Sequence, residues 1–181
     1  MEDKSWLVTW ATYGSWLPGD PRGFRTFRAK EYVPPPERYA KDGEATYDPQ
    51  DYADRYAKAK EQTPTAVRLS AAEQSICMKA IVEELALLQI PVHIISVEDY
   101  HVHLIAPFGV HWIRPTVGRL KSAATRAIPN PGDRKRIWAK NCHMASLNSD
   151  TALVNATAYV RHHGEQGAII WEPQAVALGD G

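Results

Sequence analysis

The sequence predicts an α+β fold in which one antiparallel sheet is covered by helices. First, segments rich in β-branched and aromatic residues alternate along the chain with segments whose apolar residues recur at helical spacing. Second, residues 92–97 and 100–107 are two predicted strands joined by a tight Glu98-Asp99 turn, which makes them a hairpin. Third, the 181 residues, 44% hydrophobic and 23% charged, have the size and composition of one ordinary globular domain.

The first strand is expected over residues 6–13, an aromatic and β-branched run that stops at Gly14. Residues 16–28 contain Leu-Pro-Gly-Asp-Pro-Arg-Gly, which is typical of turns. Residues 29–65 are polar and rich in proline and tyrosine, with one short helix expected near 51–61. We interpret this stretch as an insertion in a single domain over residues 1–181, not as a second domain.

A helix follows the insertion. Ser70-Ala71-Ala72-Glu73 is a capping-box pattern, in which the serine bonds forward and the glutamate bonds back. The helix ends before Pro91. Its apolar residues at helical spacing are Met78, Val82, Leu85 and Leu88.

The remaining elements follow the hairpin. A helix is expected from about Pro115, a strand over 136–147, and a last helix over 150–163 that closes at Gly164. The order is therefore β-α-β-β-α-β-α. Its first six elements form the ferredoxin-like pattern, an antiparallel sheet with two helices on one face. This fold serves many functions, so it indicates none by itself.

The net charge is zero, with 21 basic and 21 acidic residues, which argues against a strongly basic nucleic-acid binder. The charges are unevenly distributed, however. Residues 101–149 contain eight basic residues and one acidic residue, a net charge of +7, between segments of net charge −4 (61–100) and −3 (150–181). For any single residue of this set, a solvated helix face or a charged turn is the ordinary explanation.

Several classes of protein are excluded by composition. No apolar run approaches the ~20 residues that a membrane-spanning helix needs, and the first residues lack a signal-peptide pattern. Two cysteines, Cys77 and Cys142, cannot form a disulfide framework or a four-thiolate zinc site. We expect a cytoplasmic protein without a membrane partner.

His101 and His103 lie in a predicted strand, where side chains alternate between the two faces. Both imidazoles therefore point the same way, while Val102 points into the core. Two neighbouring imidazoles make half of a metal site. The alternative is that both are polar residues on a solvated face.

Tyr159 and His163 are four residues apart on the last predicted helix, so they stack on one face, away from the centre of its apolar stripe. His162 lies ~100° around the helix from His163 and cannot serve the same site equally. The alternatives are a capping histidine for His163 and a surface tyrosine for Tyr159.

The ordered combination of motifs resembles the HUH-type single-tyrosine transposases, which include the REP-associated tyrosine transposases. The resemblance covers roughly residues 5–28 and 70–172. The residues that carry it are Thr12 to Gly23, Val97-Glu98-Asp99-Tyr100-His101-Val102-His103-Leu104, Leu120-Lys121-Ser122, Ile137-Trp138, and Tyr159 followed by His163.

The resemblance implies a metal-dependent active site. His101, His103 and His163 would hold a divalent ion, Mg²⁺ or Mn²⁺. The family often has glutamine or asparagine where this chain has His163, and the histidine favours a softer metal such as Mn²⁺. Gln166 is a distant alternative ligand.

The resemblance also implies that Tyr159 attacks a DNA phosphate and forms a 5′-phosphotyrosine, which leads to cleavage and strand transfer of single-stranded or hairpin DNA. A homodimer is possible. Two alternatives remain: a domesticated, sequence-specific DNA-binding protein without transposition activity, and a metalloenzyme that does not act on DNA. The residues expected to contact DNA are Arg22, Arg114, Arg119, Lys121, Arg126, Arg134, Lys135, Arg136 and Lys140.

Overall fold

The structure is a computed structural model that describes residues 4–21, 24–25, 32–33, 49–63, 65–129 and 136–173. The chain forms two compact units. The first comprises Met1–Ala11 and Arg68–Gly181, and the second Thr12–Val67. The single-domain organisation stays a prediction. Within the described ranges every helix is too short or too polar to span a membrane.

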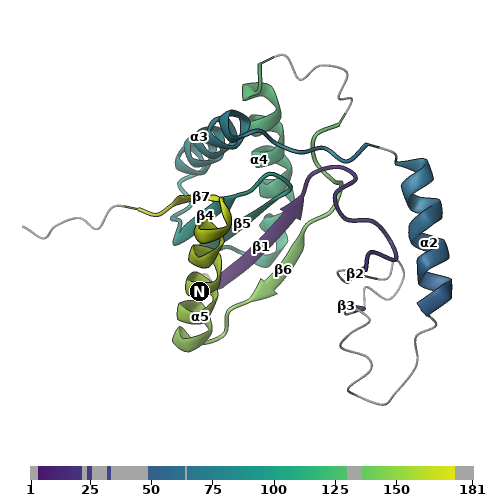
Figure 1. Ribbon diagram of the computed structural model, residues 1–181. Helices are drawn as coiled ribbons and strands as arrows, with labels where there is room; N and C mark the ends of the chain where they lie inside the picture. The colour runs from purple at the N-terminus through teal and green to yellow at the C-terminus, as the bar shows by residue number, and fades with distance from the viewer. Residues whose placement is uncertain are drawn as a thin grey trace, which may run out of the picture. The chain divides into compact units, whose positions relative to one another are not determined.

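The α+β class is confirmed: the first unit is built on a five-stranded antiparallel sheet. The strands lie in the order β6-β1-β5-β4-β7 (Figure 1). Two of the expected strands form the hairpin between β4 and β5, and β1 pairs with β5 at the centre of the sheet. The bounds are β1 Ser5–Ala11, β4 Ile94–Val97, β5 His101–Pro107, β6 His143–Ser146 and β7 Ile169–Trp171.

The structure differs from the sequence analysis at two strands, one shorter than expected and one not predicted. The strand expected over 136–147 is restricted to β6, because the carbonyls of Ala139, Lys140 and Asn141 accept hydrogen bonds from the Lys121 ammonium at 2.8, 3.4 and 3.0 Å. Carbonyls gathered around one amine do not form a strand ladder. The edge strand β7 was not predicted, since three residues directly after a helix are too short for a clear strand pattern.

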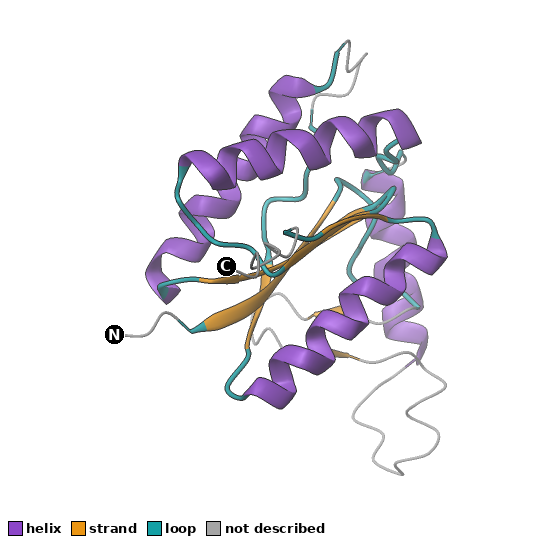
Figure 2. Ribbon diagram, turned by 90° about the vertical axis from the view of Figure 1, so that its left-hand side faces the viewer, coloured by secondary structure: helices purple, strands orange, loops and turns teal. Residues whose placement is uncertain are grey.

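The first unit has helices on both faces of its sheet. The helices α3 (Ala71–Leu87) and α4 (Ile113–Ala127) cover one face, and α5 (Asp150–His162) covers the other (Figure 2). A short 3₁₀ helix, η1 (Val110–Trp112), precedes α4, and another, η2 (His163–Gln166), follows α5. The two helices on one face were expected, and the sequence left the position of α5 open.

The capping box at the start of α3 is confirmed. The Ser70 hydroxyl accepts a hydrogen bond from the Glu73 amide at 3.3 Å, and the Glu73 carboxylate accepts one from the Ser70 amide at 2.8 Å. The helix α5 begins similarly, with Ser149 accepting from the Ala152 amide at 3.1 Å. These caps satisfy amides that have no partner inside a helix.

Apolar packing attaches α5 to the sheet. Val160 is fully buried in a cluster with Ile94 of β4 and Ile105 of β5. Leu7, Leu147, Leu153, Ala156 and Ile170 pack around this cluster. At the end of the helix, Arg161 donates two hydrogen bonds to Glu172, at 2.8 and 3.1 Å. This packing determines which residues of α5 face the sheet.

The second unit contains the expected short helix, α2 (Pro49–Gln62), and a two-stranded pairing of β2 (Phe24–Arg25) with β3 (Tyr32–Val33). Gly19 has a φ of +80°, and a Cβ atom there would lie 2.3 Å from the Tyr52 carbonyl oxygen. This position therefore requires glycine.

Val160→Ala should lower the free energy of unfolding by about 1–3 kcal/mol, because it removes two fully buried methyl groups and leaves a cavity. Val154→Ala is the matched control on the same helix: Val154 is 65% exposed, and its loss should change stability by less than about 0.5 kcal/mol. Urea unfolding followed by circular dichroism measures both. Equal destabilisation by the two variants would contradict this packing.

Candidate functional site

Four buried side chains converge on the α5 face of the sheet: Glu98, His101, His103 and His163. One possible ligand atom from each lies within 4.8 Å of the others. The structure thus brings together the three histidines that the resemblance assigned to a metal. It adds Glu98, which the sequence analysis had placed in a turn.

The register of the hairpin explains this convergence. His103 lies opposite Ser96 on β4 and Thr9 on β1. The Glu98 amide donates a hydrogen bond to the His101 carbonyl at 2.9 Å, so these two residues pair across the hairpin and the turn falls at Asp99 and Tyr100. Since side chains alternate along strands, residues 98, 101 and 103 share one face. The register of the hairpin is therefore the signal that places Glu98 beside the histidines.

The turn that carries this pair is held in place by Arg68. Its guanidinium donates to the Asp99 carboxylate at 2.9 Å and lies 4.7 Å above the centre of the Tyr100 ring. The adjacent Leu69 amide donates to the Asp99 carbonyl at 2.7 Å. The Tyr100 ring in turn lies 4.2 Å from that of His101, between ring centres.

His163 enters from the first residue of η2, directly after α5. Its ring centre lies 4.6 Å from that of His103 and 5.4 Å from that of His101. Its Nδ1 atom is 2.5 Å from Glu98 Oε1, which is also 3.0 Å from His101 Nε2. One carboxylate oxygen therefore lies between two imidazoles.

Tyr159 lies one helical turn before His163, at the rim of the cluster. Its ring centre is 4.8 Å from that of His163 and 5.5 Å from that of His103. The residue is 51% exposed, whereas the four residues of the cluster are buried. A reacting group from solution can therefore approach the tyrosine beside the cluster.

Several polar atoms of the cluster have no hydrogen bond. Among the described residues, no hydrogen-bond partner exists for Glu98 Oε1, His101 Nδ1, His103 Nε2 or either ring nitrogen of His163. Each buried polar atom without a partner costs about 1–3 kcal/mol. A bound metal ion would satisfy such atoms.

The protonation states suit a metal ligand set. Burial, together with the neighbouring His101 and His163, lowers the pKa of His103 to about 2. Burial also lowers the pKa of His163, against the opposing effect of the Glu98 carboxylate. Neutral imidazoles offer the lone pair that a metal requires.

Thr9 orients His103. Its hydroxyl oxygen lies 2.7 Å from His103 Nδ1. In the tautomer that donates from Nδ1 to Thr9, the buried Nε2 atom is unprotonated and able to bind a metal. Such a hydrogen bond to the far ring nitrogen is the usual support of a metal-binding histidine.

The donor set fits a transition-metal ion. Three imidazoles with one carboxylate suit Mn²⁺, Zn²⁺ or a related ion, whereas Mg²⁺ prefers oxygen ligands and water. Gln166, the distant alternative ligand, is exposed and lies outside the cluster. His162 is also exposed, with its Nδ1 atom 3.0 Å from the Glu165 carboxylate.

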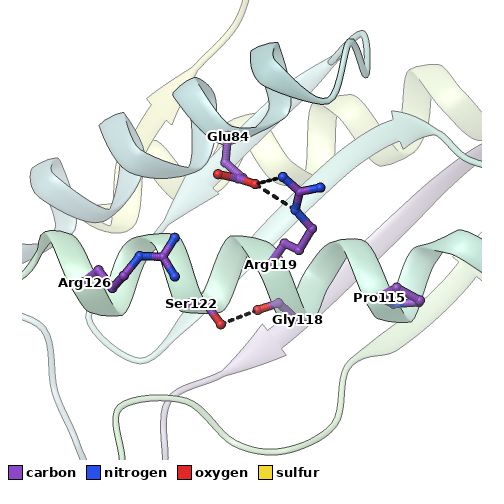
Figure 3. Close-up of a pocket in the computed structure, with 6 residues that line it drawn as sticks. All are labelled: Glu84, Pro115, Gly118, Arg119, Ser122 and Arg126. Carbon is purple, nitrogen blue, oxygen red and sulfur yellow. Dashed lines mark hydrogen bonds and ion pairs between the residues drawn. The ribbon is translucent and has the colours of Figure 1, made fainter.

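Two of the basic residues expected to contact DNA hold the fold together. Arg119 on α4 donates two hydrogen bonds to Glu84 on α3, at 2.9 and 2.6 Å (Figure 3). Lys121 binds the three carbonyls of residues 139–141, as described above. These two contacts attach α4 to its neighbours.

Other basic residues line a groove. Arg126, Arg136 and Lys140 lie along a groove of about 520 Å³ between α4 and residues 136–140. Arg126 also lines a pocket of about 450 Å³ together with the Arg119–Glu84 pair (Figure 3). Arg114 is exposed near the start of α4. Arg22, Arg134 and Lys135 lie outside the described residues.

This groove and the histidine cluster belong to different faces of the sheet. The groove is formed beside α4, and Trp138 in its wall packs against Trp10 with ring centres 6.4 Å apart. The cluster lies on the α5 face, because His101 and His103 share a face of β5 with Ile105, which packs against Val160 of α5. The basic segment therefore does not surround the cluster, although it lies between the hairpin and α5 in the sequence. Its contact with DNA stays a prediction.

No family model and no curated protein matches this sequence. One solved structure to which the chain is similar is described as a REP-associated tyrosine transposase bound to a REP hairpin. The identity is 11%, the TM-score is 0.49, and the match covers 92% of this chain and 70% of that chain. The function has to be inferred from the side chains of the site.

Thr9→Val should weaken Mn²⁺ binding by about 10–100-fold, because it keeps the shape of the side chain but removes the oxygen that orients His103. The measurement is calorimetric titration of the EDTA-stripped protein with MnCl₂. Thr125→Val makes the same chemical change at an exposed hydroxyl that bonds its own helix, and it should leave the affinity unchanged. Equal affinities for the two variants would argue against a role of Thr9.

Proposed function

We propose that this chain is a divalent-metal-dependent DNA strand transferase that cleaves and rejoins single-stranded or hairpin DNA through Tyr159, as in DNA transposition. The observation that carries the proposal is the position of Tyr159. A half-exposed tyrosine lies beside three buried histidines, on the helix that directly precedes the third of them.

His101, His103 and His163 would hold the metal ion. When bound, the ion would polarise the scissile phosphate and stabilise the charge that develops on it. Burial lowers the pKa of His103 and of His163, which favours their neutral imidazoles, and it holds all three rings in place before substrate arrives. Their short approaches to one another leave the ligand atoms nearly preassembled.

The nucleophile is the phenol oxygen of Tyr159. Partial burial and the nearby Glu98 carboxylate raise the pKa of Tyr159, so the phenol is protonated at neutral pH. An unactivated phenol is a poor nucleophile, which explains why the reaction needs an electrophile made more reactive. The tyrosine is accessible to a phosphate in solution.

The proposed reaction exchanges one phosphoester bond for another. The Tyr159 oxygen forms a bond to phosphorus as the bond from phosphorus to the 3′ oxygen breaks, and the phenol proton leaves with the 3′-hydroxyl. The product is a 5′-phosphotyrosine. Since one phosphoester replaces another, a second 3′-hydroxyl can attack this intermediate and join the strands without a nucleotide cofactor.

The groove beside α4 would bind the DNA backbone outside the reacting site. Arg126 and Lys140 are exposed and line the same groove, and Arg136 lies with them. Positive charge spaced along a groove suits the phosphates of a nucleic acid. Contacts on the α4 face would hold a second part of the DNA while the α5 face acts on the scissile phosphate.

Wild-type protein should form a covalent adduct with a labelled DNA hairpin in the presence of Mn²⁺, and Tyr159→Phe should form none, because it lacks the phenol oxygen. A denaturing gel detects the adduct. Tyr100→Phe is the matched control, since Tyr100 contacts the His101 ring from the hairpin turn. EDTA should abolish the adduct in both active proteins.

Two results would contradict the proposed function. An adduct that persists in Tyr159→Phe would show that another residue is the nucleophile. If wild-type protein with bound Mn²⁺ forms no adduct on hairpins or single strands of varied sequence, the protein is not a strand transferase of this kind.

The double variant Arg126→Gln with Lys140→Gln should bind single-stranded DNA more weakly, with a shallower dependence of affinity on salt. Each phosphate contact contributes a slope of about 0.7 on logarithmic axes for single strands, so the slope should fall by about 1.4. Fluorescence anisotropy at several salt concentrations measures it. Lys79→Gln removes an exposed charge from α3 and serves as the control. An unchanged salt dependence in the double variant would exclude the groove as a DNA-binding surface.

A further inference from the structure

Glu98 is an unusual residue for the place it occupies. Its side chain is 8% exposed, and a carboxylate is rarely buried so deeply without a permanent positive partner. Within the described ranges its ion-pair partners are His101 and His163 alone. Neither an arginine nor a lysine compensates its charge there. The burial therefore requires another source of positive charge.

The two imidazoles are not a permanent source of that charge, because a histidine side chain is not permanently charged as an arginine or a lysine is. A single carboxylate oxygen of Glu98 lies 3.0 Å from His101 Nε2 and 2.5 Å from His163 Nδ1, so it is shared between two imidazoles.

The position of the same oxygen suits a metal ligand. Glu98 Oε1 is one of the four ligand atoms that lie within 4.8 Å of one another, and it lies 3.0 Å from His101 Nε2. Two ligands that are each about 2.0–2.2 Å from one ion lie roughly 3 to 4.4 Å apart, which the Glu98–His101 separation fits. The 2.5 Å between Glu98 Oε1 and His163 Nδ1 would lengthen slightly when an ion binds between them. A divalent ion among them would supply the positive charge.

We propose that Glu98 is a fourth ligand of the metal centre, which makes it a site of three histidines and one glutamate that selects a transition ion such as Mn²⁺ over Mg²⁺. This inference rests on the proposed function, because it assigns a further ligand to the same centre. Three imidazoles disfavour Mg²⁺. The carboxylate lowers the net charge of the loaded site from +2 to +1 and strengthens retention of the ion when DNA is absent.

The test is metal binding by the full chain, without DNA. Glu98→Gln keeps the size of the side chain and removes its charge. In calorimetric titrations of EDTA-stripped protein, it should weaken Mn²⁺ binding by about 10–100-fold. Wild-type protein should bind Mn²⁺ more tightly than Mg²⁺. Glu165→Gln is the matched control: it removes an exposed glutamate that pairs with His162, and its Mn²⁺ affinity should equal that of wild type.

Co²⁺ provides a second readout. Its visible absorption depends on the number and type of its ligands, so the spectrum of the Co²⁺-loaded protein should change in Glu98→Gln and remain unchanged in Glu165→Gln. Circular dichroism of the metal-free proteins checks folding. If Glu98→Gln does not fold, Glu98→Asp keeps the charge but shortens the side chain, and it should bind Mn²⁺ more weakly than wild type.

The outcomes separate this inference from the proposed function. A folded Glu98 variant with wild-type Mn²⁺ affinity and an unchanged Co²⁺ spectrum would overturn the role of Glu98 and leave the three histidines as ligands. Wild-type protein that binds neither Mn²⁺ nor Co²⁺ would overturn the metal centre and the proposed function together. If the wild-type protein binds Mg²⁺ more tightly than Mn²⁺, the proposed selectivity for a transition ion is wrong.

Discussion

The packing of α5 against the sheet is the constraint on which the site depends. Val160 is buried against Ile94 and Ile105, and this contact determines how the helix is rotated on the sheet. Tyr159 and His163 flank that contact along the chain, so they are directed to the end of the sheet where His101 and His103 lie. A helix rotated by one residue would turn the tyrosine away from the histidines.

The site combines two opposing requirements. Burial lowers the pKa of His103 and of His163 and so favours their neutral forms, whereas the role proposed for Tyr159 requires exposure to a substrate. The sheet and α5 satisfy both, because the hairpin carries the histidines into the interior and the helix holds Tyr159 at the rim. The buried polar atoms without hydrogen bonds then have a physical explanation. Their lone pairs are not used within the fold, so they are available to bind a ligand.

The basic residues of segment 101–149 show what composition predicts and what it does not. Eight basic residues over 101–149 indicated a partner with phosphates, but Arg119 bonds to Glu84 and Lys121 bonds to backbone carbonyls. These contacts join segments that are far apart in sequence, and so no local pattern could predict them. The groove that remains faces away from the histidine cluster. Under the proposed function, DNA binding and DNA chemistry would therefore use different faces of one sheet.

The sequence by itself determined the α+β class, the hairpin, the capped helix α3, and the pairing of Tyr159 with His163 on one face, because all of these follow from local periodicity and capping. The tertiary structure alone decided that α5 covers the face opposite to α3 and α4, that β7 completes the sheet, and that Glu98 joins the three histidines. Such features depend on strand register and on packing between distant segments. One residue of register decides whether a side chain such as Glu98 points into the site or away from it.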